Sequence, residues 1–156
     1  MNEFIQRVKN FGIGRIIKSY DFIISLVISL VGIFTFFEQL LPMEIRTNFL
    51  SDIIGASITV TTLVLAGFAI VISLMEKELV HYLKKYNIYD NIIFTFEYTA
   101  IISLLTFFVS LISKYLYFNK YLFYFNLFLT IYLIATLVQL IFFITAFGIK
   151  KGELYK

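Results

Sequence analysis

Cysteine and tryptophan are absent from this chain, and proline occurs once. Without cysteine there is no disulfide framework, no thiol nucleophile and no thiolate metal site. Charge is also scarce, because charged residues make up 15% of the 156 residues while hydrophobic residues make up 60%. Soluble domains average about 25% charged and about 45–50% apolar residues. The composition therefore excludes an ordinary soluble domain and indicates a membrane protein.

Four apolar stretches account for most of the chain. Crossing a bilayer takes about 20 apolar residues per helix, and lipid admits only helices or closed barrels, which satisfy every backbone polar group. We therefore predict an all-α protein with four transmembrane helices in residues 22–149, between an arm of residues 1–21 and a tail of residues 150–156. The predicted spans are residues 22–37, 53–75, 92–113 and 122–149.

The basic residues divide unevenly between the two ends of these spans. Arg46, Lys114 and Lys120 fall on one side, and the other 10 of the 13 Lys and Arg residues fall on the opposite side. Because cytoplasmic loops carry the excess of Lys and Arg, we predict cytoplasmic termini and a cytoplasmic central loop, in a multi-pass protein of the bacterial inner membrane. The first stretch lacks a small-residue cleavage site, so we expect it to be retained rather than removed as a signal peptide.

Two segments outside the spans also carry a pattern. Residues 1–21 are basic and amphipathic, which predicts either an arm on the membrane surface or a simple lead-in to the first span. We expect Pro42 to end the first span, followed by a loop to about Asp52. Nothing between residues 53 and 86 is expected to break a helix, so a helix about 50 Å long would carry the second span on into the cytoplasm.

Small and weakly polar residues recur along one line of the second span and one line of the third. Such residues let membrane helices approach closely, so the two lines could pack on each other or on a neighbouring subunit. Alternatively, the line on the second span could border a water-filled path in a homo-oligomer. The pore-lining candidates are Thr59, Thr62, Ala66, Ser73 and Glu76. The full lines are Gly55, Thr59, Thr62, Ala66, Ala69, Ser73 and Glu76 on the second span, and Thr95, Thr99, Ser103, Thr106, Ser110 and Ser113 on the third.

Isolated polar residues give little sign of chemistry. Glu97 is an acid inside the third span, where a carboxylate is costly, and we expect it to pair with Lys84 or Lys85. Gln139 in the fourth span is expected to form an interhelical hydrogen bond. His81 is the single histidine and has no cysteine or carboxylate pair at ligand spacing. We therefore predict no metal, no cofactor and no enzymatic activity.

Basic residues of two segments are predicted to share the cytoplasmic face. Topology and contact with lipid headgroups explain them in part. In a symmetric oligomer, however, a ring of cations could bind a phosphate-rich ligand such as a nucleotide or a short oligonucleotide. The candidate ligand-binding residues are Arg7, Lys9, Arg15, Lys18, Lys77, His81, Lys84 and Lys85.

In organisation the chain resembles the small four-span membrane effectors of bacterial anti-phage systems, such as the channel subunit of Hailong systems or the membrane subunit of Kiwa systems. The resemblance covers the whole length and consists of four apolar spans, a basic cytoplasmic face, a long second helix and no enzymatic domain. It implies an oligomeric channel, controlled by a cytoplasmic signal and possessing an operon-encoded partner, that depolarises the membrane during infection.

Three other functions fit the same size and composition. A membrane sensor or scaffold would associate with partners without passing ions. Small multidrug transporters also have four spans, but their essential acid lies in the first span, and residues 22–37 contain none. A phage holin would match the modest basic tail at Lys150 and Lys151 and would need no ligand-binding face.

Overall fold

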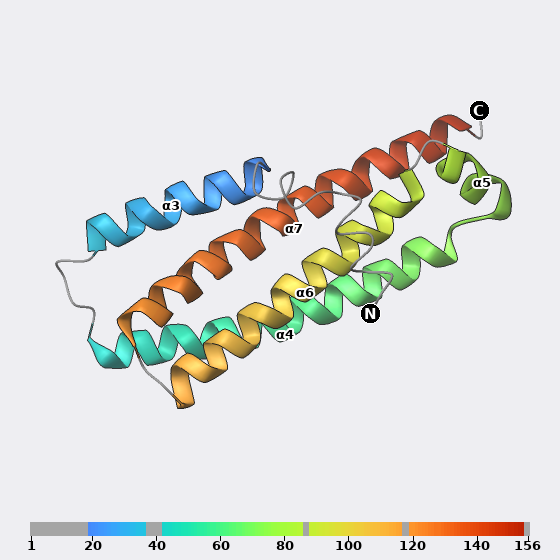
Figure 1. The fold of residues 1–156 in the computed structure, drawn as a ribbon. Helices are drawn as coiled ribbons and strands as arrows, with labels where there is room; N and C mark the ends of the chain where they lie inside the picture. Colours follow the sequence, from blue (N-terminus) through green and yellow to red (C-terminus); the bar gives the residue numbers. More distant parts are fainter. Residues whose placement is uncertain (1–18, 37–41, 86–87, 117–118, 155–156) are drawn as a thin grey trace.

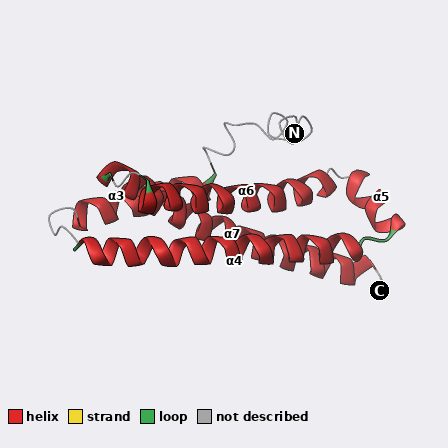
Figure 2. Ribbon diagram, turned by 90° about the horizontal axis from the view of Figure 1, so that it is seen from below, coloured by secondary structure: helices red, strands yellow, loops and turns green. Residues whose placement is uncertain are grey.

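The computed structural model describes residues 19–36, 42–85, 88–116 and 119–154. Within those ranges the chain forms helices and no strands, as the composition predicts. The longer helices run roughly side by side, with α5 and the C-terminal end of α7 at the same end of the bundle (Figures 1 and 2). The helices are α3 (Tyr20–Phe36), α4 (Met43–Ser73), α5 (Lys77–Lys85), α6 (Ile88–Tyr115) and α7 (Lys120–Leu154).

Three of these helices are long and apolar enough to cross a bilayer. Their apolar parts are Glu44–Ser73, Ile88–Tyr115 and Tyr121–Thr145, and each exceeds the about 20 residues that a crossing needs. Hydroxyl side chains do not interrupt these helices, because they donate to carbonyl oxygens of the preceding turn. Thr145 Oγ1, for example, donates to the carbonyl oxygen of Ile141 at 2.9 Å. By length and composition, the chain is therefore an all-helical membrane protein.

The first predicted span corresponds to α3, which is shorter. Its 17 residues would extend about 25 Å, less than a hydrocarbon core of about 30 Å. Near its start, Phe22 packs edge-on against Phe128 and Tyr132, at ring-centroid distances of 5.6 Å and 5.7 Å. Thus α3 begins beside the middle of α7 and lies along the half of α7 that starts at Lys120 (Figure 1). A fourth crossing stays a prediction, and most of the predicted arm, residues 1–18, lies outside the described residues.

The start of α4 differs from the prediction. We expected a loop from Pro42 to about Asp52, but the helix begins at Met43 and includes the whole of that segment. Proline lacks an N–H group, and the first N–H groups of a helix have no partner within it, so Pro42 suits the position just before the first turn. The carbonyl oxygen of Pro42 already accepts a hydrogen bond from the N–H of Arg46 at 3.2 Å.

The end of α4 also differs from the prediction. The expected unbroken helix to residue 86 is wrong, because α4 ends at Ser73 and a turn separates it from α5. The reason lies in α5, whose Leu79 and Leu83 are each only 4% exposed. These two leucines pack with Ile92 of α6 in the core, and a straight continuation of α4 would carry them away from the bundle.

The last helix, α7, is continuous from Lys120 to Leu154. It begins two residues before the predicted fourth span and continues through most of the predicted tail of residues 150–156. The tail is therefore largely helical, and its cytoplasmic location stays a prediction.

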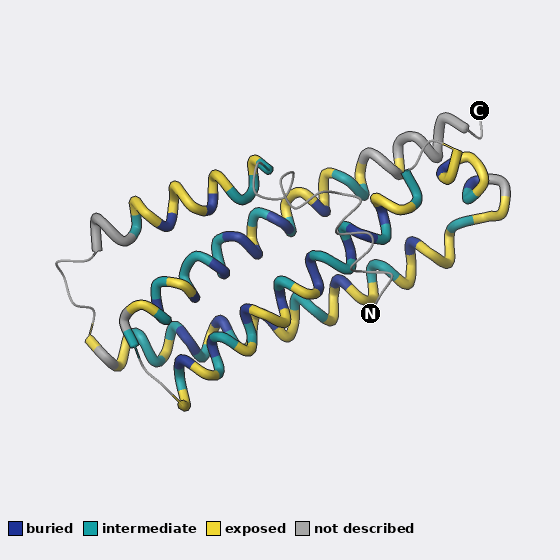
Figure 3. The backbone as a smooth tube through the Cα atoms, in the orientation of Figure 1, coloured by how far each residue is buried: buried dark blue, intermediate teal, exposed yellow. Residues whose placement is uncertain are grey.

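The best-packed core lies between α4 and α6, near α5. The rings of Phe68 and Phe96 lie 5.3 Å apart there, and a Cβ placed on Gly67 would lie 3.6 Å from Phe96 Cε1. Buried residues follow the inner sides of α4, α6 and α7, while much of the outer surface of α4 is exposed (Figure 3). The core cluster consists of Val64, Val71, Leu79, Leu83, Ile92, Phe96, Ala100 and Leu140.

Candidate functional site

The helix that contains the second predicted span, α4, has two distinct sides. One side packs into the bundle and includes Leu50, Ile53 and Val64, which are 0%, 5% and 4% exposed. At about 3.6 residues per turn, the line of small residues falls on roughly the opposite side of the helix. All of its helical members are exposed, and they point away from the bundle. These members, which we call the α4 stripe, are Gly55, Thr59, Thr62, Ala66, Ala69 and Ser73.

The corresponding line of small residues on α6 is mostly buried, unlike the α4 stripe. Ser103 Oγ donates to the carbonyl oxygen of Ser57 on α4 at 2.7 Å, and Ser110 Oγ donates to Asn126 Oδ1 on α7 at 2.9 Å. This line is the packing seam of α6 against both neighbours. The expectation that the two lines pack on each other is therefore wrong, because α6 contacts the other side of α4. The buried members are Thr99, Ser103, Thr106, Ser110 and Ser113.

The hydroxyl groups of the α4 stripe are satisfied within their own helix. Thr59 Oγ1 donates to the carbonyl oxygen of Gly55 at 2.9 Å, and Ser73 Oγ donates to that of Ile70 at 2.7 Å. Thr62 Oγ1 donates to that of Ile58 at 3.0 Å. Each oxygen still has lone pairs that can accept a hydrogen bond. The α4 stripe can therefore face a helix or water without leaving a donor unpaired.

Rows of large side chains border the α4 stripe on both sides. One row consists of Ile58, Leu65 and Ile72, and the other consists of Leu63 and Ile70. Each of these five side chains is between 42% and 66% exposed. The small residues thus form a strip of short side chains between two rows of larger apolar ones, and we call these rows the apolar ridges and the strip between them the groove. A Cβ added to Gly55 would meet nothing within 4 Å, so the strip is open at that residue. Such a groove admits a second helix at close range.

Glu76 does not continue the α4 stripe. In the sequence, Glu76 continues the line of small and weakly polar residues after Ser73. In the structure, however, the helix ends at Ser73 and Glu76 belongs to the turn before α5. Its side chain is exposed. As a pore-lining residue it would have to act from this turn rather than from the helix that carries Thr59 to Ser73.

The basic residues of α5 occupy one side of a short amphipathic helix. Leu79 and Leu83 face the core, and the cationic side chains lie on the opposite side, exposed to solvent. Lys84 Nζ lies 5.3 Å from the centre of the Tyr89 ring on α6, so this lysine is partly held in place. The members of this basic face are Lys77, His81, Lys84 and Lys85. The remaining ligand-binding candidates, Arg7, Lys9, Arg15 and Lys18, lie outside the described residues.

The two interior polar candidates are placed differently. Glu97 is half-buried on α6. Gln139 is exposed on α7, so its interhelical hydrogen bond stays a prediction, which would require a helix of another subunit. Instead, Asn126 is the fully buried amide of α7, and it accepts the hydrogen bond from Ser110. In the described part of the chain, no three His, Cys, Asp or Glu residues gather as metal ligands.

Sequence reasoning missed a polar cluster at the start of α3. Ser19 caps the helix, its Oγ accepting a hydrogen bond from the N–H of Phe22 at 3.3 Å. Asp21 follows in the first turn, and the next residue, Phe22, packs against Tyr132 of α7, whose hydroxyl group hydrogen-bonds with that of Tyr98 on α6. The available signal was a serine followed closely by an acid at the start of an apolar run, which is a helix-start pattern. Its depth in the bundle could not be read from that pattern.

Comparison with protein-family models, with curated proteins and with solved structures finds no match for this chain.

Proposed function

We propose that the chain is a subunit of a homo-oligomeric ion channel or pore-forming effector of the bacterial inner membrane. Its gating signal is a cytoplasmic anion, either a nucleotide or a short oligonucleotide, and its role is anti-phage defence with an operon-encoded partner. The observation that carries the proposal is the α4 stripe, which is polar and small yet faces outward from its own bundle.

The α4 stripe supports an oligomer because little of α4 is covered by the rest of its own subunit. Of the three long apolar helices, α4 has the smallest buried share. Small residues let helices approach closely, and a helix facing lipid has no need of them. Copies of α4 arranged around a symmetry axis would bring Thr59, Thr62, Ala66 and Ser73 together. Their hydroxyl lone pairs could then line a path for water and ions.

The basic face of α5 provides the proposed link to a signal. Its cations lie outside, while its leucines share a core with Val71 near the end of α4. A phosphate-rich ligand that draws the α5 helices of several copies together would therefore also move the end of the pore helix. Only the short turn at Leu74, Met75 and Glu76 separates the two helices, so little of this motion would be lost.

The proposed topology has four crossings, with α3 belonging to the first. The N-terminus, α5 and the C-terminal tail are then cytoplasmic, since the segments at this face contain most of the Lys and Arg residues. The turn between α6 and α7 and the start of α4 face the outside.

A cysteine-accessibility experiment tests the channel. The chain has no native cysteine, so single cysteines at Thr62 and Ala66 can be probed in reconstituted bilayers with a charged thiol reagent. We expect current block at both positions. Ser57, which is 1% exposed on the inner side of α4, and the apolar ridge residue Leu63 are matched controls that should not respond. Current that persists unblocked at both stripe positions would exclude α4 as the pore helix.

A sensor or scaffold without ion flux is the second candidate. It is favoured by the same groove, because the stripe hydroxyl groups are already bonded within α4 and could pack against another helix with no water between. The Thr62 cysteine distinguishes the two functions. Disulfide cross-linking between copies, together with an absence of flux in liposomes, would support the scaffold.

A further inference from the structure

The polar cluster at the start of α3 lies deep in the apolar part of the bundle. Tyr132 is near the middle of the apolar part of α7, Tyr121–Thr145, and is therefore about 16–20 Å along the helix axis from either end. With a hydrocarbon core of about 30 Å, this tyrosine lies near mid-depth. Phe22 packs against its ring, so the first turn of α3 is held at that depth too.

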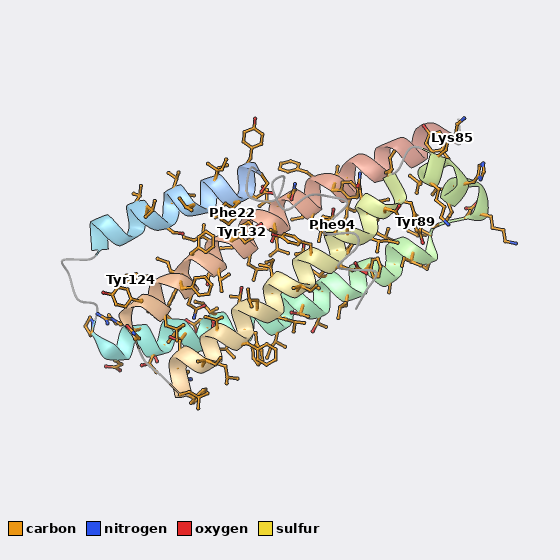
Figure 4. All side chains as sticks on the ribbon, in the orientation of Figure 1. Phe22, Lys85, Tyr89, Phe94, Tyr124 and Tyr132 are labelled. Atoms are coloured by element: carbon orange, nitrogen blue, oxygen red, sulfur yellow. The ribbon has the colours of Figure 1, made fainter. Side chains whose placement is uncertain are left out.

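Hydroxyl groups from three segments lie together there. The Ser19 side chain lies near the hydroxyl group of Tyr132. The hydroxyl groups of Tyr132 and Tyr98 hydrogen-bond to each other, with their rings packed edge-on at a centroid distance of 6.3 Å. Tyr132 is only 4% exposed. A hydrogen bond therefore joins α6 to α7 at the place where Phe22 of α3 packs on Tyr132; Figure 4 shows Phe22 and Tyr132 close together there.

Asp21 directly precedes Phe22 in the first turn of α3, so its carboxyl group lies at about the same depth as these hydroxyl groups. Its side chain is half-buried. Tyr98 of α6 and Tyr132 of α7 are the titratable groups near enough to interact with its charge. Within the described residues, no basic side chain forms an ion pair with this carboxylate, and no hydrogen-bond donor reaches it.

A carboxylate in such a place is unstable unless something neutralises it. Removing the charge from water is costly in an apolar environment, and the N-terminus of α3 offers only partial compensation through its dipole. A bound proton removes the charge and turns the carboxyl group into a hydrogen-bond donor. Tyrosine and serine hydroxyl groups can accept that hydrogen bond, since each both donates and accepts.

We propose that Asp21, together with Ser19, Tyr98 and Tyr132, forms a proton-binding site at mid-depth of the bundle. Proton binding there neutralises the first turn of α3 and favours its docking on α6 and α7. Loss of the proton leaves a charge that is better placed in water, and α3 is then held less tightly. The proposal concerns α3 and is independent of the proposed pore on α4 and of the anion-binding face on α5.

A fluorescent hydrophobic carbodiimide tests the site, because such reagents modify protonated carboxyl groups in apolar surroundings. The full chain is reconstituted in liposomes, labelled between pH 5 and pH 9, and mapped by peptide mass spectrometry. We expect label on Asp21 at low pH that falls at least tenfold as the pH rises. The exposed acids Asp52 and Asp90 are internal controls that should stay unlabelled.

Variants make the test specific. Asp21→Asn should lose the label, whereas Tyr132→Phe should keep it and move the pH of half-labelling. Size-exclusion chromatography confirms that each variant is assembled like the parent chain. An unlabelled Asp21 at every pH in assembled protein would overturn the proposal, and so would labelling that does not change with pH. Protection by Na⁺ at constant pH would show a sodium site instead of a proton site.

The docking of α3 has its own measurement. A Cβ on Gly32 would lie 3.8 Å from Leu127 Cδ2 of α7, so a cysteine pair at these positions reports whether α3 is docked. Cross-linking in the parent background should fall with rising pH relative to the same pair carrying Asp21→Asn. The Asn background corrects for the pH dependence of thiol chemistry itself. Equal profiles in the two backgrounds would refute control of docking by Asp21.

Discussion

At the scale of single residues, the neighbouring helices decide which hydrogen-bond partner each hydroxyl or amide side chain has. Ser103 and Ser110 hydrogen-bond between helices, whereas Thr59 and Thr62 bond only to their own helix. Buried Asn126 has one paired atom, Oδ1, while its Nδ2 has no hydrogen-bond partner in the described residues. Interhelical hydrogen bonds in membranes average only about 0.6 kcal/mol. Close packing of small side chains is therefore a larger part of what joins α4, α6 and α7.

Two glycines of α4 provide a matched pair of substitutions. Gly67→Leu should destabilise the fold by about 1–3 kcal/mol, because a side chain there meets the ring of Phe96. Gly55→Leu should leave the stability of the subunit unchanged, since nothing lies within 4 Å of its added Cβ. Unfolding in mixed detergent micelles measures both. Equal losses of stability would contradict the outward orientation of Gly55.

The same Gly55→Leu variant bears on assembly. A leucine would fill the groove between the apolar ridges, so the proposed oligomer should dissociate to smaller species. Light scattering after size-exclusion chromatography measures the mass of the complex. An unchanged oligomer would show that α4 faces lipid at this turn.

At the scale of elements, α5 shows how an amphipathic pattern bends the chain. Leu79 and Leu83 are buried against α6, and their burial sets the turn after Ser73. The basic side of α5 is consequently exposed to solvent at the end of the bundle. Helix periodicity identifies which residues share that side, but the direction of α5 depends on the apolar surface of α6.

Charge reversal on α5 tests the proposed ligand face. The double substitution Lys84→Glu with Lys85→Glu should abolish binding of a fluorescent short single-stranded oligonucleotide to the reconstituted protein. In the parent chain, binding should weaken steeply with salt, because each phosphate contact releases counterions. Fluorescence anisotropy at several salt concentrations measures both effects.

Lys114→Glu is the control for that experiment. Its ammonium group lies 4.7 Å from the centre of the Tyr115 ring, which matches the Lys84–Tyr89 contact, but it is located at the opposite end of α6. Binding should survive this change. Loss of binding in Lys114→Glu alone would point to the other membrane face, and retention of salt-insensitive binding after the α5 reversal would remove α5 from the ligand site.

At the scale of the whole molecule, the number of crossings decides the topology. Three helices are long enough to span a bilayer, and α3 extends along only half of α7 in its described residues (Figure 1). Four crossings put the two termini on the same side, whereas three put them on opposite sides. Reporter enzymes fused before Met1 and after Lys156 should both be active in the cytoplasm, and a reporter inserted near Arg46 should be external. Reporters on opposite sides for the two termini would reduce the count to three.

Much of the fold follows from local sequence. The long apolar runs predict helices, and the second, third and fourth predicted spans all coincide with helices of the structure. The first helix was also placed correctly, within a residue or two of its ends. Boundaries set by packing were missed, such as the start of α4 at Met43 and its end at Ser73. Of the candidate sites, the grouping of three lysines and His81 on one side of α5 follows from periodicity, whereas the cluster around Asp21 does not.

The sequence by itself determined that this protein is helical and suited to a membrane, because apolar length and backbone hydrogen bonding are local properties. It also determined which residues share a side of each helix. The tertiary structure alone decided which side faces inward. Similar lines of small residues occur on α4 and α6, yet Ser103 is buried and Thr62 is exposed. Burial depends on where neighbouring helices lie, and no pattern within one helix contains that information.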